Sequence, residues 1–172
     1  MSLILNIDTS VQTASIALAR DGVTIDIAVN PSLRDHASWL QPAIRQLIAD
    51  QRISLNQLDA IAVTSGPGSY TGLRVGMATA KGLCYALKKQ LITIGTLQMM
   101  ASAATENATT ELLCPMIDAR RMEVFTAVYD RSLNELKAPH SCILTEESFD
   151  DLMNGNTISF FGNGSEKFRT LT

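Results

Sequence analysis

Two stretches of the sequence follow the same pattern, and this repetition constrains the fold more than any other feature. Residues 3–22, LILNIDTSVQTASIALARDG, begin with an apolar strand that ends in Ile7–Asp8 and then turn into an alternating strand. Residues 112–132, LLCPMIDARRMEVFTAVYDRS, repeat that order, with Ile117–Asp118 at the end of the apolar strand. A repeated supersecondary pattern indicates a duplicated unit.

The order of the elements predicts the architecture of each unit. In the first copy the Asp-Gly turn at 21–22 tolerates positive φ and leads into a third alternating strand, Val23–Val29. Apolar residues at helical spacing then predict a helix capped by Asp35 and ending near Asp50. Further patterns predict a buried strand at 58–65, a helix at 69–89, a strand at 90–95 and a helix at 96–104. Three antiparallel strands followed by strand–helix crossovers predict a mixed α/β sheet with helices on its faces, the ribonuclease H-like arrangement.

The second copy is shorter than the first. After its two strands the sequence predicts a helix near 146–153 and a strand at 157–162, and the chain stops at Thr172. We therefore expect a first lobe at 1–104 and an incomplete second lobe at 105–172, belonging to a truncated or partly ordered chain.

Composition excludes several classes of protein. The 172 residues are 46% hydrophobic and 18% charged, which suits a globular protein with a sizeable core. The net charge of −3 argues against a chain that holds RNA by itself, so any tRNA contact should be indirect. No apolar run suits a membrane helix and the N-terminus lacks a signal-peptide pattern, so we expect a cytoplasmic protein. Three cysteines without a C-x-x-C argue against a disulfide framework and against zinc.

A glycine-rich segment, SGPGSYTG at 65–72, joins the predicted strand to the predicted helix at 69–89. Free amides at the start of such a helix attract anions, but the lysine of a P-loop is missing here. Ser69 or Thr71 could simply cap the helix. Spacing alone leaves both alternatives open.

The two aspartates of the repeat are open to the same two interpretations. Asp8 and Asp118 could each hold Mg²⁺ through water, as phosphoryl transfer requires. Each could equally cap its own turn through the backbone. His36 and His140 belong to no H-E-x-x-H motif, and no G-x-S-x-G occurs, so the sequence gives no support to a peptidase.

Together, the segments NIDTS, SGPGSYTGLRVG, AKGL and MIDARRMEVFTAVY resemble the bacterial TsaB family, also called YeaZ. The resemblance covers nearly the whole chain and implies duplicated lobes of the actin-like ATPase and sugar-kinase superfold. It also implies a part in making threonylcarbamoyladenosine on tRNA, at the adenosine next to the anticodon. There the family member is a non-catalytic subunit that scaffolds and activates the catalytic homologue TsaD, with the ATPase TsaE as a further partner. ATP is used by the complex, no cofactor is expected in this chain, and a nucleotide at a subunit interface is left open.

The residues after the strand at 90–95 agree with a non-catalytic role. The catalytic relatives carry an H-x-x-x-H metal pair at this place, where this chain has Thr96 and Met100. A hydroxyl and a thioether are poor ligands for the metals of such chemistry, which implies that the metal site is lost. An active ATPase or small-molecule kinase of the same superfold is the alternative, with Asp8, Ser69 and Asp118 at its centre.

The resemblance also places contacts on the first two long helices, both for the catalytic partner and for a homodimer when that partner is absent. The small residues four apart at Gly72, Gly76 and Ala80 would let a partner helix approach closely, or would simply belong to a buried helix. The predicted interface comprises Ala37, Leu40, Ile44, Leu47, Thr71, Gly72, Arg74, Val75, Gly76, Ala78, Thr79, Ala80 and Leu83. A vestigial phosphate or anion site would comprise Asp8, Thr9, Ser10, Gly66, Gly68, Ser69, Tyr70 and Asp118.

Overall fold

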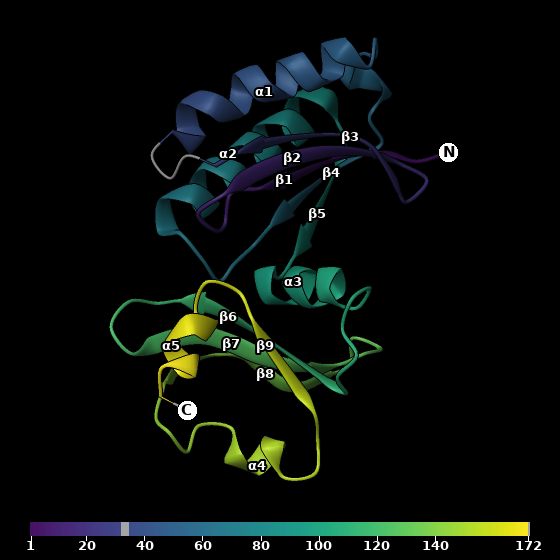
Figure 1. Cartoon of the computed structure of the whole chain (residues 1–172). Coiled ribbons are helices and arrows are strands. Elements are labelled where there is room, and N and C mark those ends of the chain that lie inside the picture. The colour runs from purple at the N-terminus through teal and green to yellow at the C-terminus, as the bar shows by residue number, and fades with distance from the viewer. Residues whose placement is uncertain (32–34, 172) are drawn as a thin grey trace. The chain divides into compact units, whose positions relative to one another are not determined.

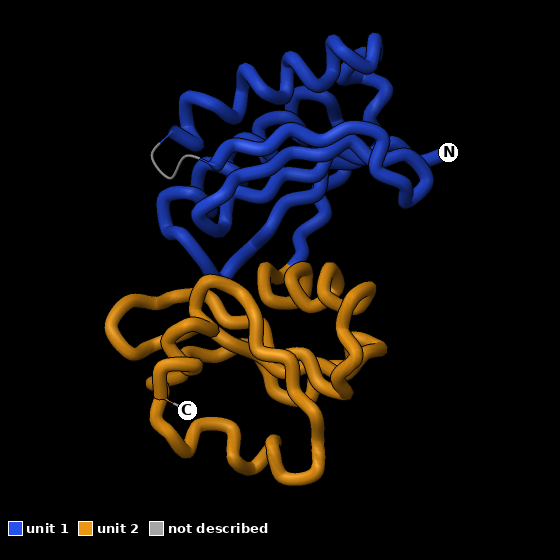
Figure 2. Tube along the Cα trace, in the orientation of Figure 1, with its two compact units in different colours: residues 1–94 blue, residues 95–172 orange. Residues whose placement is uncertain are grey.

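A computed structural model describes residues 1–31 and 35–171, and the chain divides into two compact units, 1–94 and 95–172 (Figure 2). Each unit is built around its own sheet (Figure 1). Among the described residues, no helix is both long and apolar enough to cross a membrane.

The first unit is a five-stranded sheet in the order β3-β2-β1-β4-β5. β1 pairs antiparallel with β2 and β2 with β3, whereas β4 runs parallel to β1 and β5 parallel to β4. Its strands are β1 (Leu3–Asp8), β2 (Ala14–Arg20), β3 (Val23–Asn30), β4 (Ala60–Thr64) and β5 (Gln90–Ile94). Its helices are α1 (His36–Asp50), the short 3₁₀ helix η1 (Leu55–Gln57) and α2 (Tyr70–Leu87).

Alternation along the strands decides which face of this sheet is buried. In β1 every second side chain, from Leu3 through Leu5 to Ile7, is buried, because α1 and α2 cover that face. Leu40 of α1 and Ala80 of α2 belong to the same apolar core. Figure 1 shows the two helices side by side over the sheet, and they contact one another.

The second unit repeats this layout with a four-stranded sheet in the order β8-β7-β6-β9. Its strands are β6 (Leu112–Asp118), β7 (Glu123–Asp130), β8 (Glu135–Ile143) and β9 (Ile158–Phe161). Its helices are α3 (Thr96–Ala104), α4 (Asp150–Met153) and α5 (Ser165–Arg169). The same antiparallel meander and parallel crossover in both sheets confirm the duplicated ribonuclease H-like arrangement.

The structure differs from the sequence prediction at four places. The helix α3, expected to close the first lobe, lies in the second unit because it packs on β6 and β7. The strand β8 was not predicted, since its side chains are mostly exposed and it contains Pro139, so no alternation marks it. In the second copy α4 is shorter than expected and α5 follows β9. Asp35 stands at the start of α1, but its side chain makes no capping hydrogen bond.

Candidate functional site

The glycine-rich loop before α2 packs directly against the turn that follows β1. A Cβ atom at Gly68 would overlap the carbonyl oxygen of Ser10, and one at Gly72 would overlap the carbonyl oxygen of Thr9. Gly68 also has a φ of +155°, which side-chain-bearing residues rarely adopt. Glycine is therefore required here by contact between two backbone segments of the first unit.

Hydrogen bonds inside the chain occupy much of this loop. The Ser69 amide donates to the Ser10 carbonyl at 2.6 Å, and the Thr9 hydroxyl donates to the Gly72 carbonyl at 2.7 Å. The predicted cap is confirmed at Ser69, whose hydroxyl accepts from the Gly72 amide at 3.2 Å. The Ser69 and Gly72 amides at this helix start are therefore already paired within the chain and are not available to a bound phosphate.

Asp8 holds its own turn and ties it to the next parallel strand. Its Oδ1 accepts from the Ser10 amide at 2.9 Å, the Ser10 hydroxyl at 2.6 Å and the Thr64 hydroxyl at 2.8 Å. These bonds are those of a side chain that caps a turn, one of the two interpretations left open by the sequence.

Asp118, in the second unit, is neutralised by a cation of that unit. Its Oδ1 accepts from Lys167 Nζ at 2.7 Å and from the Arg120 amide at 2.6 Å. The hydrogen bond from Lys167 lowers the pKa of the Asp118 carboxyl below its ordinary value, although partial burial opposes this. The Asp118 amide in turn donates to Asn163 Oδ1 at 3.0 Å.

The two aspartates also differ in the face of the sheet from which they extend. Asp8 lies on the opposite face from Ile7, which packs under α1 and α2. Asp118 shares its face with Met116, which packs with Phe168 of α5. The repeated Ile-Asp pattern therefore marks the same strand end in both units without giving the two carboxylates the same surroundings.

The ion pair in the second unit gives a pH-dependent prediction. A carboxyl with a lowered folded pKa stabilises the fold above about pH 4, and this contribution is lost as the pH falls through the folded pKa. In Lys167→Met the pKa of Asp118 should rise toward its ordinary value. The loss of stability at neutral pH should stay below about 1 kcal/mol, because the Asp118 side chain is 40% exposed.

Carboxyl-carbon NMR titration of both proteins measures this shift. Asp130 is the internal control, because Asn134 rather than a lysine lowers its pKa, and its titration should not change. An Asp118 that titrates identically in both proteins would show that Lys167 does not hold it.

Thr96 and Met100, the residues that the sequence placed at the position of a metal pair, both lie on α3. Thr96 is fully buried at the start of α3, and its hydroxyl has no hydrogen-bond partner in the part of the chain that the structure describes. The Met100 methyl lies beside Gly162, where a Cβ atom would approach it to 2.6 Å. Nowhere in residues 1–31 and 35–171 do three His, Cys, Asp or Glu side chains gather as metal ligands would.

Six of the predicted interface residues are buried inside the first unit, which corrects their assignment to a partner surface. They are Leu40, Ile44, Leu47, Gly72, Gly76 and Ala80. The small residues of α2 serve its own sheet, because a Cβ at Gly76 would meet Thr9, Val63 and Ile7. The side chains of Ala37, Thr71, Arg74 and Ala78 are exposed, and those of Val75, Thr79 and Leu83 are half-buried.

The solvent face of α2 carries Lys81 and Tyr85, which the sequence analysis did not single out, beside Tyr70 and Arg74. Tyr85 is 90% exposed and Tyr70 68% exposed, and the Arg74 guanidinium lies 4.0 Å from the centre of the Tyr70 ring. Tyr70 thus points to solvent on this face instead of joining the anion site. Helical spacing from Tyr70 and Arg74 to positions 81 and 85 is the signal that could have identified Lys81 and Tyr85.

A groove of about 490 Å³ runs beside this face. It is lined by Thr64, Ser65, Tyr70, Leu73, Arg74, Met77, Ala78 and Lys81. Leu73 and Met77 make its floor apolar, with Arg74 and Lys81 as its cationic groups. Such a groove suits an apolar side chain of another protein better than a small polar ligand.

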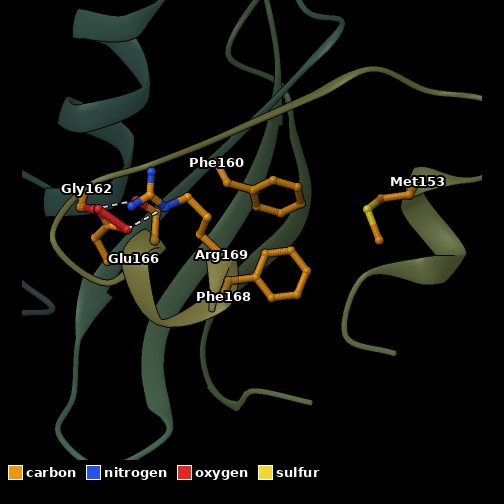
Figure 3. A pocket seen from close by; sticks show the side chains of 7 residues that line it. Met153, Phe160, Gly162, Glu166, Phe168 and Arg169 are labelled. Carbon is orange, nitrogen blue, oxygen red and sulfur yellow. Dashed lines mark hydrogen bonds and ion pairs between the residues drawn. The ribbon is translucent and has the colours of Figure 1, made fainter. Parts of the chain in front are cut away.

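The second unit has a hollow of about 610 Å³ between α4, β9 and α5 (Figure 3). The rings of Phe160 and Phe168, with centroids 4.9 Å apart, face into it, and Met153 faces them from α4. Arg169 and Glu166 form an exposed ion pair at 2.8 Å beside it. Among the described residues that line the hollow, no three His, Cys, Asp or Glu side chains gather as metal ligands would.

Comparison with known proteins adds independent findings. A family model described as TsaD, tRNA N6-adenosine threonylcarbamoyltransferase, matches residues 24–171. The tRNA threonylcarbamoyladenosine biosynthesis protein TsaB of Escherichia coli (strain K12) is 36% identical over 132 residues, which cover 76% of this chain and 56% of the relative. TsaB of Haemophilus influenzae is 38% identical over 122 residues, which cover 71% of this chain and 51% of the relative. The chain therefore spans about half the length of these curated relatives.

Two solved structures match the fold. A Pseudomonas aeruginosa protein described as uncharacterized, with similarity to peptidase YEAZ, has 31% identity and a TM-score of 0.74. The match covers 86% of this chain and 68% of that protein. YeaZ from Pseudomonas aeruginosa has 22% identity and a TM-score of 0.80. That match covers 99% of this chain and 91% of the YeaZ chain.

Proposed function

The chain belongs to the TsaB (YeaZ) family, and on that basis we propose that it serves the synthesis of threonylcarbamoyladenosine on tRNA as a non-catalytic subunit. In this proposal it binds and activates the catalytic threonylcarbamoyltransferase in the cytoplasm, in a complex that also uses the ATPase TsaE. It meets tRNA only through that complex, and it pairs with itself when the transferase is absent.

The proposal of a non-catalytic role rests on one observation: groups of the glycine-rich loop are hydrogen-bonded to other parts of the same chain. The Ser69 amide and the Thr9 hydroxyl are bonded to backbone carbonyls, and Asp8 and Asp118 accept hydrogen bonds from side chains of their own units. Phosphoryl transfer needs amides and carboxylates that are free to receive phosphate and Mg²⁺. The internal pairing of these amides and carboxylates supports a structural role for the loop, as a connection between β1 and α2, over a role in binding nucleotide.

The solvent face of α2 supports the partner role. A predominantly apolar groove beside two exposed tyrosines and an arginine has the composition of a binding surface, because aromatic side chains and Arg are enriched at the centres of interfaces. The buried stripe of small residues fixes α2 to its own sheet and so holds this face in place.

Light-scattering mass, measured on the chain alone and mixed with the transferase subunit of the same organism, tests the proposal. We expect a homodimer that converts to a one-to-one heterodimer. A monomer that ignores the transferase at micromolar concentration would contradict the partner role.

Nucleotide titration tests the non-catalytic part separately. We expect no ATP binding below millimolar concentration by the isolated chain. Tight ATP binding that is lost in Asp8→Ala would show instead that the loop and Asp8 form a working nucleotide site.

A further inference from the structure

The exposed face of α2 has a charge pattern of one sign. Tyr70, Arg74, Lys81 and Tyr85 recur at helical spacing, and we call these four residues the basic stripe. The 18 residues of α2 include no Asp or Glu, and Lys88 follows directly at its end. This is unusual in a chain whose net charge is −3.

No acidic side chain among the described residues forms an ion pair with the cations of the basic stripe. The ion pairs between described residues, Lys167–Asp118 and Arg169–Glu166, both lie in the second unit. The guanidinium of Arg74 rests on the Tyr70 ring instead of a carboxylate, which keeps its donors available. Lys81 is exposed at the edge of the apolar groove.

We infer that the basic stripe selects a protein surface carrying Asp or Glu around an apolar side chain, and that it opposes pairing of this chain with itself. The apolar side chain would enter the groove over Leu73 and Met77, while the carboxylates would meet Arg74 and Lys81. The inference rests on the proposed function, because it describes the surface of the transferase that α2 would meet.

Symmetry supplies the second half of the inference. A homodimer with a two-fold axis uses the same patch on both subunits, so α2 would face α2. Arg74 and Lys81 of one copy would then lie near those of the other without any α2 carboxylate between them. Opposed like charges disfavour the homodimer relative to an acidic partner, which is how repulsion contributes to specificity.

A nucleic-acid backbone is the other polyanion that a basic and aromatic surface could meet. The groove between the cations argues for protein, since its apolar floor offers nothing to a phosphate or a ribose. The overall negative charge of the chain also opposes long-range attraction of RNA.

Salt dependence and charge reversal test the inference, with the transferase subunit of the same organism as the probe. Raising NaCl from about 50 to 500 mM should weaken the heterodimer about tenfold, while the homodimer should hold or tighten. The double variant Arg74→Glu/Lys81→Glu should weaken the heterodimer by at least about tenfold. The same variant mixed with wild-type chain should form the mixed dimer in preference to either homodimer.

The matched control is Arg20→Glu/Arg131→Glu, which makes the same charge change at exposed sites outside α2 and should bind like wild type. A heterodimer that is indifferent to salt and to the reversal of Arg74 and Lys81 would overturn the inference while leaving the proposed function intact. If the chain forms no heterodimer with the transferase at any salt concentration, both the inference and the proposed function are wrong. A gel shift of tRNA by the isolated wild-type chain, lost in the double variant, would overturn it in favour of RNA.

Discussion

Gly72→Ala is expected to lower the free energy of unfolding of the first unit by about 3 kcal/mol or more. The added Cβ would overlap the carbonyl oxygen of Thr9, a backbone atom in the turn between two paired strands. Neither the turn nor α2 can yield easily, because the Thr9 hydroxyl is bonded to the Gly72 carbonyl at 2.7 Å. Accommodating the methyl group would separate helix from sheet and break this contact.

Urea denaturation followed by tryptophan fluorescence measures the effect. The single tryptophan, Trp39, packs against the core of the first unit and so reports its unfolding. Gly82→Ala is the matched control in the same helix. Gly82 is exposed with no atom near its missing Cβ, so alanine there should raise stability by about 0.5–1 kcal/mol.

Opposite signs for one chemical change at two sites of α2 would identify contact with the β1–β2 turn as the cause. A Gly72→Ala protein as stable as wild type would contradict the packing of the glycine-rich loop described above.

Phe168→Ala should destabilise the second unit by about 3–5 kcal/mol. Phe168 is 4% exposed and packs in edge-on and tilted geometry against Phe149 and Phe160, with centroids 5.3 and 4.9 Å away. It is the buried side chain that α5 contributes to this core, so its removal enlarges a hollow that is already about 610 Å³. The cost should therefore lie toward the upper end of the range.

Thermal unfolding followed by far-ultraviolet circular dichroism measures this loss. Met153→Ala is the control, because Met153 lines the same hollow but is 37% exposed, and its truncation should cost less than half as much. Equal effects of the two substitutions would mean that the aromatic cluster does not hold α5 to the sheet.

Most of the fold could be predicted from local sequence patterns, chiefly the alternation of apolar residues in strands and the residues of tight turns. The strands of the first unit alternate cleanly, and the Asp21–Gly22 turn adopts the positive φ values, 50° and 82°, that its residues favour. Ser69 begins α2 as its position before a helical pattern predicted. Where the pattern was absent, as in the exposed strand β8, the prediction failed, because solvent on both sides removes the alternation that marks a strand.

The candidate site was harder to predict because its residues depend on which side of α2 faces the sheet. Gly72, Gly76 and Ala80 could serve either a partner helix or the molecule's own sheet, and sequence spacing cannot tell these apart. The structure assigns them to the sheet, which turns Arg74 and Tyr85 outward. Likewise, the ion pair of Asp118 depends on Lys167, which lies 49 positions away along the chain and so could not be identified from local sequence.

The bond between Thr9 and Gly72 has a consequence for the order of folding during synthesis. It joins residues separated by 63 positions, as Asp8 and Thr64 are joined across 56. β1, β2 and β3 leave the ribosome well before α2, so the contact between the β1–β2 turn and the start of α2 can form only later. Closing so long a loop costs entropy before its contacts repay it. The glycine-rich segment can therefore pack against the β1–β2 turn only after most of the first unit has left the exit tunnel.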